Sequence, residues 1–406
     1  MSDLSVTLIT YSSKPRGGVV HTLALAEALF AMDVDVRVLA LGDPDAGFFR
    51  PVAAPATIVP GPDAGGSLEE KVAGCIDRLA DAIAGVGSPL LHAQDCIAAR
   101  AAARVRDSGV AATVIRTVHH VDDFTSRILM DCQRAAILEP DIVLAVSEMW
   151  RGILRRDYAV EAQVVPNGVD TRRFSNPPPF RAEQMRAQVG AGPRPLILSV
   201  GGIEPRKGSD TLVAALAAVR ARRDVAPVLA VIGGHSFQDH RAYRERVLAS
   251  LEDLGLGLGD DIALIGTVPD SDMAAWYAAA DVLAFPSVKE GFGLAVLEAM
   301  SAGVPVVTSD LPVFREYLVD QRDALLVPVG DVDALAAALM RALDDEPLRA
   351  RLINGGADVA SRFTWHASAC RHLEIYTTAA AMRGFDPPRS RHYPSEISLL
   401  SDTKLL

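Results

Sequence analysis

The stretch EGFGLAVLE places two glutamates, Glu290 and Glu298, eight residues apart around a turn that contains Gly291 and Gly293. The apolar residues on both sides predict a buried strand before this turn and a helix after it. A helix that begins here would present unpaired backbone N–H groups and a partial positive charge, which together form an anion site. The glycines would let a ligand approach the backbone closely. An ordinary tight turn also favours glycine, so the turn alone leaves both interpretations open.

The two glutamates favour a ligand. Glu298 would fall in the second turn of the helix, where its side chain can point back toward the N-terminal opening. There it could accept paired hydrogen bonds from the vicinal hydroxyls of a ribose, as an acidic residue does in dinucleotide sites. Glu290, at the end of the strand, would meet hydroxyls on the other side of a phosphate. The alternative for Glu298 is a solvated helix face, which its apolar neighbours disfavour.

A second glycine-rich turn, SVGGIEPRKGSD, carries two adjacent cations, Arg206 and Lys207. It follows another predicted strand, so an anion could lie between this turn and residues 291–294 and be held by both. The alternative is a pair of solvent-exposed basic residues ahead of a helix.

Composition limits the class of protein. The chain has 406 residues, of which 50% are hydrophobic and 5% aromatic, and its net charge is −11. This length predicts two domains, and the negative charge argues against nucleic acid and against electrostatic docking to anionic membranes. No apolar run is as long as a membrane span, and the N-terminus resembles a first strand more than a secretion signal. Four scattered cysteines without a C-x-x-C pair predict reduced thiols. We therefore expect a cytoplasmic protein, and leave open peripheral association with the inner face of the membrane.

Short buried strands alternate with amphipathic helices along the chain, which predicts parallel sheets with helices on both faces. The predicted strands are 5–10, 34–41, 89–93, 112–118, 141–146 and 162–166 in the first half, and 195–201, 227–234, 261–266, 282–287, 305–309 and 324–329 in the second. Predicted helices include 19–32, 96–108, 210–221, 241–254, 272–280 and 365–382. The Pro-rich stretch from residue 174 to residue 195 predicts a linker.

We expect an α/β protein of two Rossmann-like, doubly wound domains that face a cleft, the default ligand site. The boundaries are residues 1–172 for the first domain and 173–364 for the second, with a C-terminal helix, 365–383, that packs back on the first domain. Residues 384–406 lack periodicity and are expected to form a poorly ordered tail.

Taken together, these segments resemble the retaining, nucleotide-sugar-dependent glycosyltransferases of family 4 (glycosyl transferases group 1), which have the GT-B fold. EGFGLAVLE matches that family's E-x7-E signature, and SVGGIEPRKG matches its phosphate loop. RGGVV, VPNGVD, GTVPDSDMAAWYAAADVLAFPS and SAGVPVV match in order and spacing, so that the resemblance covers about residues 4–382.

The resemblance implies roles on the donor side of the cleft. Glu290 would contact hydroxyls of the transferred sugar, and Glu298 the ribose of the nucleotide. Lys207, aided by Arg206, would neutralise the diphosphate. Residues of the turn would present backbone amides to phosphate and sugar, namely Gly291, Phe292, Gly293 and Leu294.

It also implies roles for residues of the first domain. Gly17 and Gly18, in the loop after the first strand, would close over the diphosphate. His119 aligns with the family's active-site histidine, although the adjacent His120 competes for that place. His92, also at a strand end, would help shape the acceptor site.

One departure from the family pattern concerns Gly202. Many members carry arginine here, so the second phosphate cation must come from elsewhere in this chain. Arg206 is the first substitute, provided that it points into the site, and Lys289 is another candidate.

The resemblance implies a glycosyltransferase of the hexosyltransferase type (EC 2.4). It would move a sugar from a UDP- or GDP-type nucleoside-diphosphate sugar to a hydroxyl of a small molecule, glycan or lipid, with retention of configuration. No cofactor and no metal are expected, because the DVD sequences at 33–35 and 331–333 fit helix caps better than metal ligands. The alternatives are a sugar-nucleotide epimerase or phosphorylase on the same fold, or a catalytically silent nucleotide-sugar-binding subunit. The nucleotide base, the sugar, the acceptor and the oligomeric state stay open.

Overall fold

The computed structural model describes residues 4–62, 65–175, 177–234 and 240–382. The predicted tail at 384–406 lies outside the described residues. Within them, no helix is long and apolar enough to cross a membrane.

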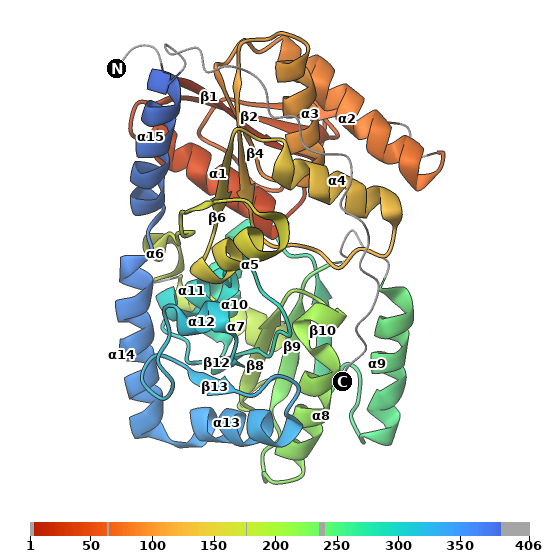
Figure 1. The fold of residues 1–406 in the computed structure, drawn as a ribbon. Helices are drawn as coiled ribbons and strands as arrows, with labels where there is room; N and C mark the ends of the chain where they lie inside the picture. Colours follow the sequence, from red (N-terminus) through yellow and green to blue (C-terminus); the bar gives the residue numbers. More distant parts are fainter. Residues whose placement is uncertain (1–3, 63–64, 176, 235–239, 383–406) are drawn as a thin grey trace.

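The first half of the chain forms a sheet of seven parallel strands in the order β3-β2-β1-β4-β5-β6-β7 (Figure 1). The strands are β1 (Ser5–Thr10), β2 (Asp35–Gly42), β3 (Ala56–Pro60), β4 (Leu90–Ala93), β5 (Thr113–Val118), β6 (Ile142–Ala145) and β7 (Gln163–Val164). Helices cover both faces: α1 (Gly17–Phe30) lies on one, while α2 (Leu68–Ala84), α3 (Cys96–Asp107) and α4 (Arg127–Leu138) lie on the other. The strands therefore have apolar residues on both sides, as parallel strands do.

The second half repeats the arrangement with six parallel strands in the order β10-β9-β8-β11-β12-β13. They are β8 (Leu196–Val200), β9 (Val228–Ile232), β10 (Ile262–Gly266), β11 (Val282–Phe285), β12 (Val306–Ser309) and β13 (Leu325–Val327). The helices are α8 (Ser209–Arg220), α9 (Arg241–Asp253), α10 (Met273–Ala279), α11 (Leu294–Ser301), α12 (Pro312–Arg315), α13 (Val332–Asp344) and α14 (Glu346–Arg362), with 3-10 turns η1 (Pro205–Lys207) and η2 (Asp270–Asp272). The two parallel sheets confirm the predicted α/β fold class.

Both sheets have the same doubly wound strand order, in which the direction of winding reverses beside the first strand. These reversals lie between β1 and β4 and between β8 and β11. Ligands of such folds bind at the carboxyl ends of the strands at these points. The segments singled out in the sequence leave the sheets there, since Gly201 follows β8 and the loop to Glu290 follows β11.

The segment between the sheets is more ordered than its prolines predicted. It contains α6 (Thr171–Phe174) and α7 (Pro179–Gln188). Pro179 occupies the first turn of α7, where a missing N–H costs no hydrogen bond. Arg186 then fixes the helix to the second half, because its Nη1 donates to the carbonyl oxygen of Ala279 over 2.7 Å. The predicted linker does connect the two sheets, and it contains a helix at residues 179–188.

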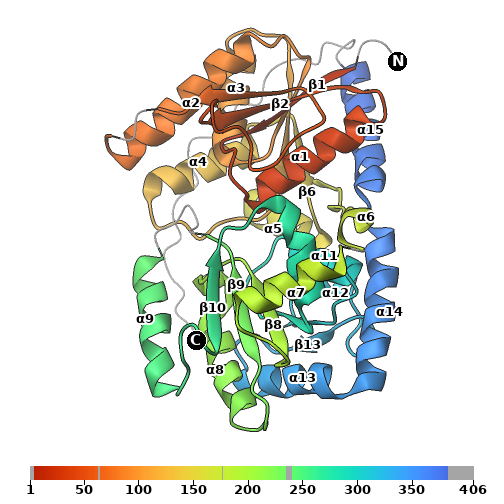
Figure 2. The same cartoon turned by 180° about the vertical axis from the view of Figure 1, so that it is seen from behind.

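The last helix, α15 (Trp365–Met382), runs beside the first sheet although it follows the second in sequence (Figures 1 and 2). Ile375 and Tyr376 of α15 lie in the same buried cluster as Val19 and Leu23 of α1. The chain thus crosses back to the first half before it leaves the described region.

Candidate active site

Glu290 lies at the centre of the site, 7% exposed, in the loop between β11 and α11. Its Oε1 accepts three hydrogen bonds: from Lys207 Nζ at 2.6 Å, from Ser287 Oγ at 2.9 Å and from Arg206 Nη1 at 3.0 Å. Within the described part of the chain, no group hydrogen bonds to the other oxygen, Oε2. The carboxylate is therefore fixed through one oxygen and keeps the second available for a ligand.

Electrostatics keep Glu290 ionised. Burial by itself would raise the pKa of Glu290, but Lys207, Arg206 and Ser287 outweigh that effect and lower it to about 2. Burial lowers the pKa of Lys207, although Glu290 opposes this. The ammonium of Lys207 also lies 4.3 Å from the centroid of the Phe285 ring. The cluster thus concentrates two cations and one anion in the loop that precedes α11.

Gly202 cannot carry the arginine found in many family members without a change in the backbone. Its φ is +73°, and a Cβ there would come within 2.8 Å of the carbonyl oxygen of Gly234. Arg206 places a second cation beside Glu290, since its guanidinium donates to that carboxylate while 33% of its side chain stays exposed. Lys289, the other candidate, pairs with Asp123 of the first half at 2.8 Å.

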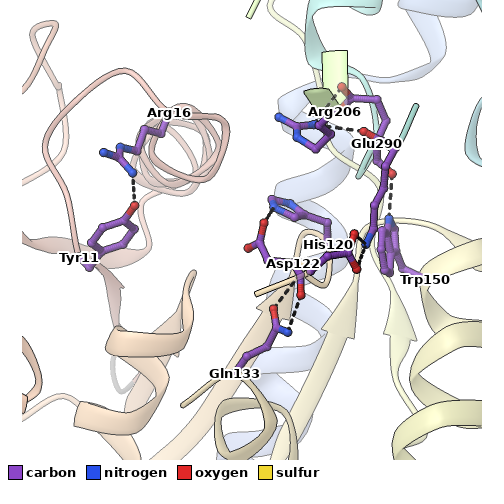
Figure 3. Close-up of polar contacts among 10 residues, drawn as sticks. Tyr11, Arg16, His120, Asp122, Gln133, Trp150, Arg206 and Glu290 are labelled. Atoms are coloured by element: carbon purple, nitrogen blue, oxygen red, sulfur yellow. Dashed lines mark hydrogen bonds and ion pairs between the residues drawn. The ribbon is translucent and has the colours of Figure 1, made fainter. Parts of the chain in front are cut away.

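Figure 3 shows how residues from the two halves of the chain face one another at the site. Arg206 and Glu290 come from the second half, and His120 and Asp122 from the first. Trp150, on α5 (Glu148–Tyr158), donates from its indole Nε1 to the carbonyl oxygen of Glu290 over 3.1 Å. In the same view, Arg16, which precedes α1, donates to the hydroxyl of Tyr11.

The helix α11 begins at the turn where the sequence predicted a helix start. Gly293 is the N-cap residue with φ +94°, no side chain caps the helix, and Leu294 is the first helical residue. Phe292 is 5% exposed, and its carbonyl oxygen accepts a hydrogen bond from the Tyr317 hydroxyl at 2.6 Å. The unpaired N–H groups at this helix start are thus not occupied by a side chain.

Gly291 touches the first half of the chain directly. A Cβ at this position would overlap the backbone carbonyl oxygen of His119. His119 also contacts Gly18, because a Cβ on Gly18 would lie 3.7 Å from its Cδ2 atom. Gly17 and Gly18 form the first turn of α1, so the prediction that they lie in a loop was wrong. The helix starts immediately after Arg16, whose extended backbone forms the N-cap.

His119 and His120 have different environments. Nε2 of His119 donates to the side-chain oxygen of Gln94 at 3.0 Å, and its ring packs edge-on against His21, 4.7 Å between centroids. His120 turns to Asp122, at 3.1 Å. Burial, with His21 and Arg116, lowers the pKa of His119 well below its usual range. Of the two, His119 is the one held between α1, β4 and the α11 turn.

His92 does not face the cleft as expected. It is fully buried, with Nδ1 at 2.6 Å from the Tyr376 hydroxyl and Nε2 at 2.7 Å from the Thr117 hydroxyl. Its ring lies 5.5 Å from that of His372 on α15. His92 therefore helps to join the C-terminal helix to the first sheet, and the prediction of an acceptor-shaping role was wrong.

Glu298 lies in the second turn of α11, half-buried. Its Oε2 accepts a hydrogen bond from the Tyr277 hydroxyl at 2.7 Å, and no described residue hydrogen bonds to its Oε1. Burial raises the pKa of Glu298, although Tyr277 and Arg173 oppose this. Like Glu290, Glu298 is held through one carboxylate oxygen, and its other oxygen is open to a ligand.

In the described ranges, no group of three or more His, Cys, Asp or Glu side chains could hold a metal ion. Asp331 caps α13 by accepting from the backbone N–H of Ala334 at 2.9 Å. Asp33, also expected to act as a cap, lies in the left-handed turn that ends α1: its φ is +57°, and its backbone N–H donates to the carbonyl oxygen of Phe30 at 3.0 Å.

Sequence reasoning missed several residues of the site, including Tyr277, which lies within one of the quoted segments but was given no role. Gln94, His21, Tyr277 and Trp150 reach the predicted residues from distant parts of the chain. A polar residue that directly follows a buried strand, as Gln94 follows β4, was the one signal available.

Comparison with known proteins agrees with this geometry. The pattern of the family described as Glycosyltransferase Family 4 matches residues 15–173, and that of Glycosyl transferases group 1 matches residues 181–359. A phosphatidyl-myo-inositol mannosyltransferase of Mycobacterium leprae is 32% identical over 384 residues, which is 91% of this chain and 95% of the relative. A D-inositol 3-phosphate glycosyltransferase of Salinispora arenicola is 32% identical over 270 residues, 62% of this chain and 58% of the relative.

Solved structures show the same fold. The sucrose-phosphate synthase of Thermosynechococcus elongatus superposes with a TM-score of 0.77 at 24% identity, over 93% of this chain and 99% of the other. Anabaena HepE in complex with UDP-glucose gives 0.75 at 19% identity, over 92% and 99%. Because the mannosyltransferase match spans almost the whole chain and both family patterns occur in order, this protein belongs to the family 4 glycosyltransferases and has the GT-B fold.

Proposed function

We propose that this glycosyltransferase moves a sugar from a nucleoside-diphosphate sugar to a hydroxyl acceptor, with retention of the anomeric configuration. The observation that carries the proposal is the cluster at Glu290, where Lys207 and Arg206 bind the carboxylate in the loop that leads to the uncapped N-terminus of α11. Cations and unpaired N–H groups at one point fit a diphosphate. A relative from Mycobacterium tuberculosis is named as GDP-mannose-dependent, and HepE was solved with UDP-glucose, which supports a donor of the UDP or GDP type.

The main chemical requirement of the proposed reaction is to stabilise the departing diphosphate. As the diphosphate departs, negative charge grows on its oxygens and the sugar becomes oxocarbenium-like. Lys207, Arg206 and the backbone amides of residues 291–294 would stabilise that charge, and preorganised groups of this kind make the greatest contribution to the rate enhancement of many enzymes. Gly17 and Gly18, at the start of α1, would approach the diphosphate from the first half.

Glu290 and Glu298 would orient the two ends of the donor. The free Oε2 of Glu290 would accept from hydroxyls of the sugar, while Oε1 stays with its three donors. The free Oε1 of Glu298 would accept from the ribose. With one oxygen tied to two cations, Glu290 is a poor nucleophile, which supports same-face substitution assisted by the leaving phosphate and hence retention.

His119 would act on the acceptor side, next to the sugar. It comes from the first half of the chain and touches Gly291 of the second, so it lies at the boundary that donor and acceptor must share. We assign residues 1–172 and 365–383 to the acceptor side and residues 173–364 to the donor side. No metal or other cofactor enters the proposal.

A donor screen followed by product analysis tests this function. Thermal-shift measurements with UDP-, GDP-, ADP- and dTDP-sugars should single out one nucleotide. Inositol-bearing acceptors come first in the transfer assay, because two relatives are named for such compounds. The NMR coupling constant of the anomeric proton should be of the same type in product and donor. Inversion would refute retention, and a chain that no nucleotide sugar stabilises would refute the donor class.

A further inference from the structure

Gln94 is a buried amide that makes one side-chain contact. It directly follows β4, is 2% exposed, and its backbone N–H donates to the carbonyl oxygen of Ile9 at 2.9 Å. Its side-chain oxygen accepts from Nε2 of His119 at 3.0 Å. Its side-chain nitrogen is buried and has no hydrogen-bond partner among the described residues.

The unpaired side-chain nitrogen of Gln94 reduces the stability of the folded chain. A buried donor without a partner destabilises the fold, because it loses its hydrogen bonds to water and gains none in the protein. Methionine has nearly the same length and would fill the space without that cost. The stability of the first sheet thus gains nothing from an amide at position 94. What the amide contributes is an acceptor for His119.

We propose that Gln94 is a positioning residue that fixes the tautomer and the orientation of His119. An amide oxygen can only accept, so Nε2 of His119 must carry the hydrogen and Nδ1 must carry the lone pair. No described residue hydrogen bonds to Nδ1, so it is available to accept from a hydroxyl of the donor sugar or the acceptor. His21 packs edge-on against the same ring, and its own Nδ1 lies 2.9 Å from the side-chain oxygen of Asn167.

The groups around His119 keep its ring neutral, as this tautomer requires. Burial has the largest effect, and His21, Arg116, His120 and His92 each lower its pKa further. A carboxylate in place of the Gln94 amide would raise the pKa of His119, because a negative charge nearby favours the imidazolium. This effect is opposite to that of the groups just named. Replacement of Gln94 by glutamate is therefore a sensitive probe of the contact.

The inference rests on the proposed role of His119, so its test needs one readout that does not depend on turnover. Selective ¹⁵N labelling of histidine reports which ring nitrogen carries the hydrogen, and a His119→Gln variant assigns the signal. The wild type should show His119 protonated at Nε2. Gln94→Met should abolish that preference and lower kcat on the order of 10²-fold, with the KM for the donor and the affinity for nucleoside diphosphate unchanged.

Gln94→Glu is the matched variant, because it keeps an acceptor at the same place. It should retain the Nε2–H tautomer, recover most of the rate lost in Gln94→Met, and move the acid limb of the kcat/KM profile to higher pH. If Gln94→Met unfolds, the acid limb of Gln94→Glu still decides. Wild-type nitrogen shifts in a folded Gln94→Met, or an unmoved acid limb in Gln94→Glu, would overturn the proposal. If no nucleotide sugar gives turnover but the shifts depend on Gln94, the positioning contact stands and the proposed function fails.

Discussion

The carbonyl oxygen of His119 lies so close to Gly291 that a methyl group on this glycine would overlap it. One residue directly follows β5 of the first sheet and the other begins the turn into α11 of the second half. The two halves of the chain therefore meet through backbone atoms at the place where the proposed donor and acceptor sides join.

Gly291→Ala should separate these two segments. Because the obstacle is backbone and not a flexible side chain, the strain cannot be relieved by a rotamer change, and we expect kcat/KM to fall on the order of 10²-fold through misplacement. Small-angle scattering should show a slightly larger radius of gyration. Gly152→Ala on α5 is the control, since nothing lies within 4 Å of its Cβ position. Equal activity of the two variants would show that the close approach of Gly291 to His119 is not required for catalysis.

Glu298→Ala should weaken nucleotide binding irrespective of the base. Without the carboxylate, the ribose hydroxyls would lose their hydrogen-bond acceptor. Hydrogen bonds to a charged group are worth about 1.5–3 kcal/mol, which corresponds to roughly a 10- to 100-fold change in Kd. Calorimetry with UDP and GDP measures this. Tyr277→Phe removes the hydroxyl that holds Oε2 but keeps the carboxylate, so its effect should be smaller. Unchanged affinity of Glu298→Ala for both nucleotides would refute the ribose assignment.

The buried histidines predict loss of stability in acid. Burial lowers the pKa of His21 to about 3 and that of His372 to about 4. Below the ordinary histidine pKa of about 6.5, the unfolded chain binds protons that the folded chain excludes, so the free energy of unfolding falls as pH falls from about 6.5 toward 4. At pH 5 each such histidine should cost roughly 2 kcal/mol.

Urea unfolding at pH 5 and pH 7.5 measures this effect. His372→Gln should reduce the difference in unfolding free energy between the two pH values, because one excluded proton is removed. His366→Gln, on the same helix but less buried, should leave the difference unchanged. If the free energy of unfolding depended on pH identically in the wild type and in His372→Gln, the loss of stability in acid could not come from the buried His372.

Local patterns predicted most of the fold. Strands such as β1 and β5 are short runs rich in Val, Ile and Thr, buried on both sides, and such runs are distinctive in sequence. β3 was missed because it is a short edge strand whose residues are partly exposed. α7 was missed because three consecutive prolines lead into its helical stretch, and a proline at the first helical position looks like a linker from sequence alone.

The residues of the candidate site also include some that local sequence patterns predicted and some that they did not. Glu290 and Lys207 belong to compact motifs with glycines at fixed offsets, so their types and spacing predicted a common ligand. Gln94 lies 25 residues from His119 along the chain, and Asn167 lies 146 residues from His21, so no local pattern connects these pairs. Only the folded chain brings them together.

Lys207 and its neighbours are proposed to bind the diphosphate of the donor. Calorimetric titration of UDP and GDP into the wild type, Lys207→Ala and Lys71→Ala tests it directly, because Lys71 is an exposed lysine on α2. We predict that one nucleotide binds the wild type and Lys71→Ala equally, and that Lys207→Ala binds it at least about tenfold more weakly, as expected for a lost charge-assisted contact. Equal affinity in all three proteins would contradict the account.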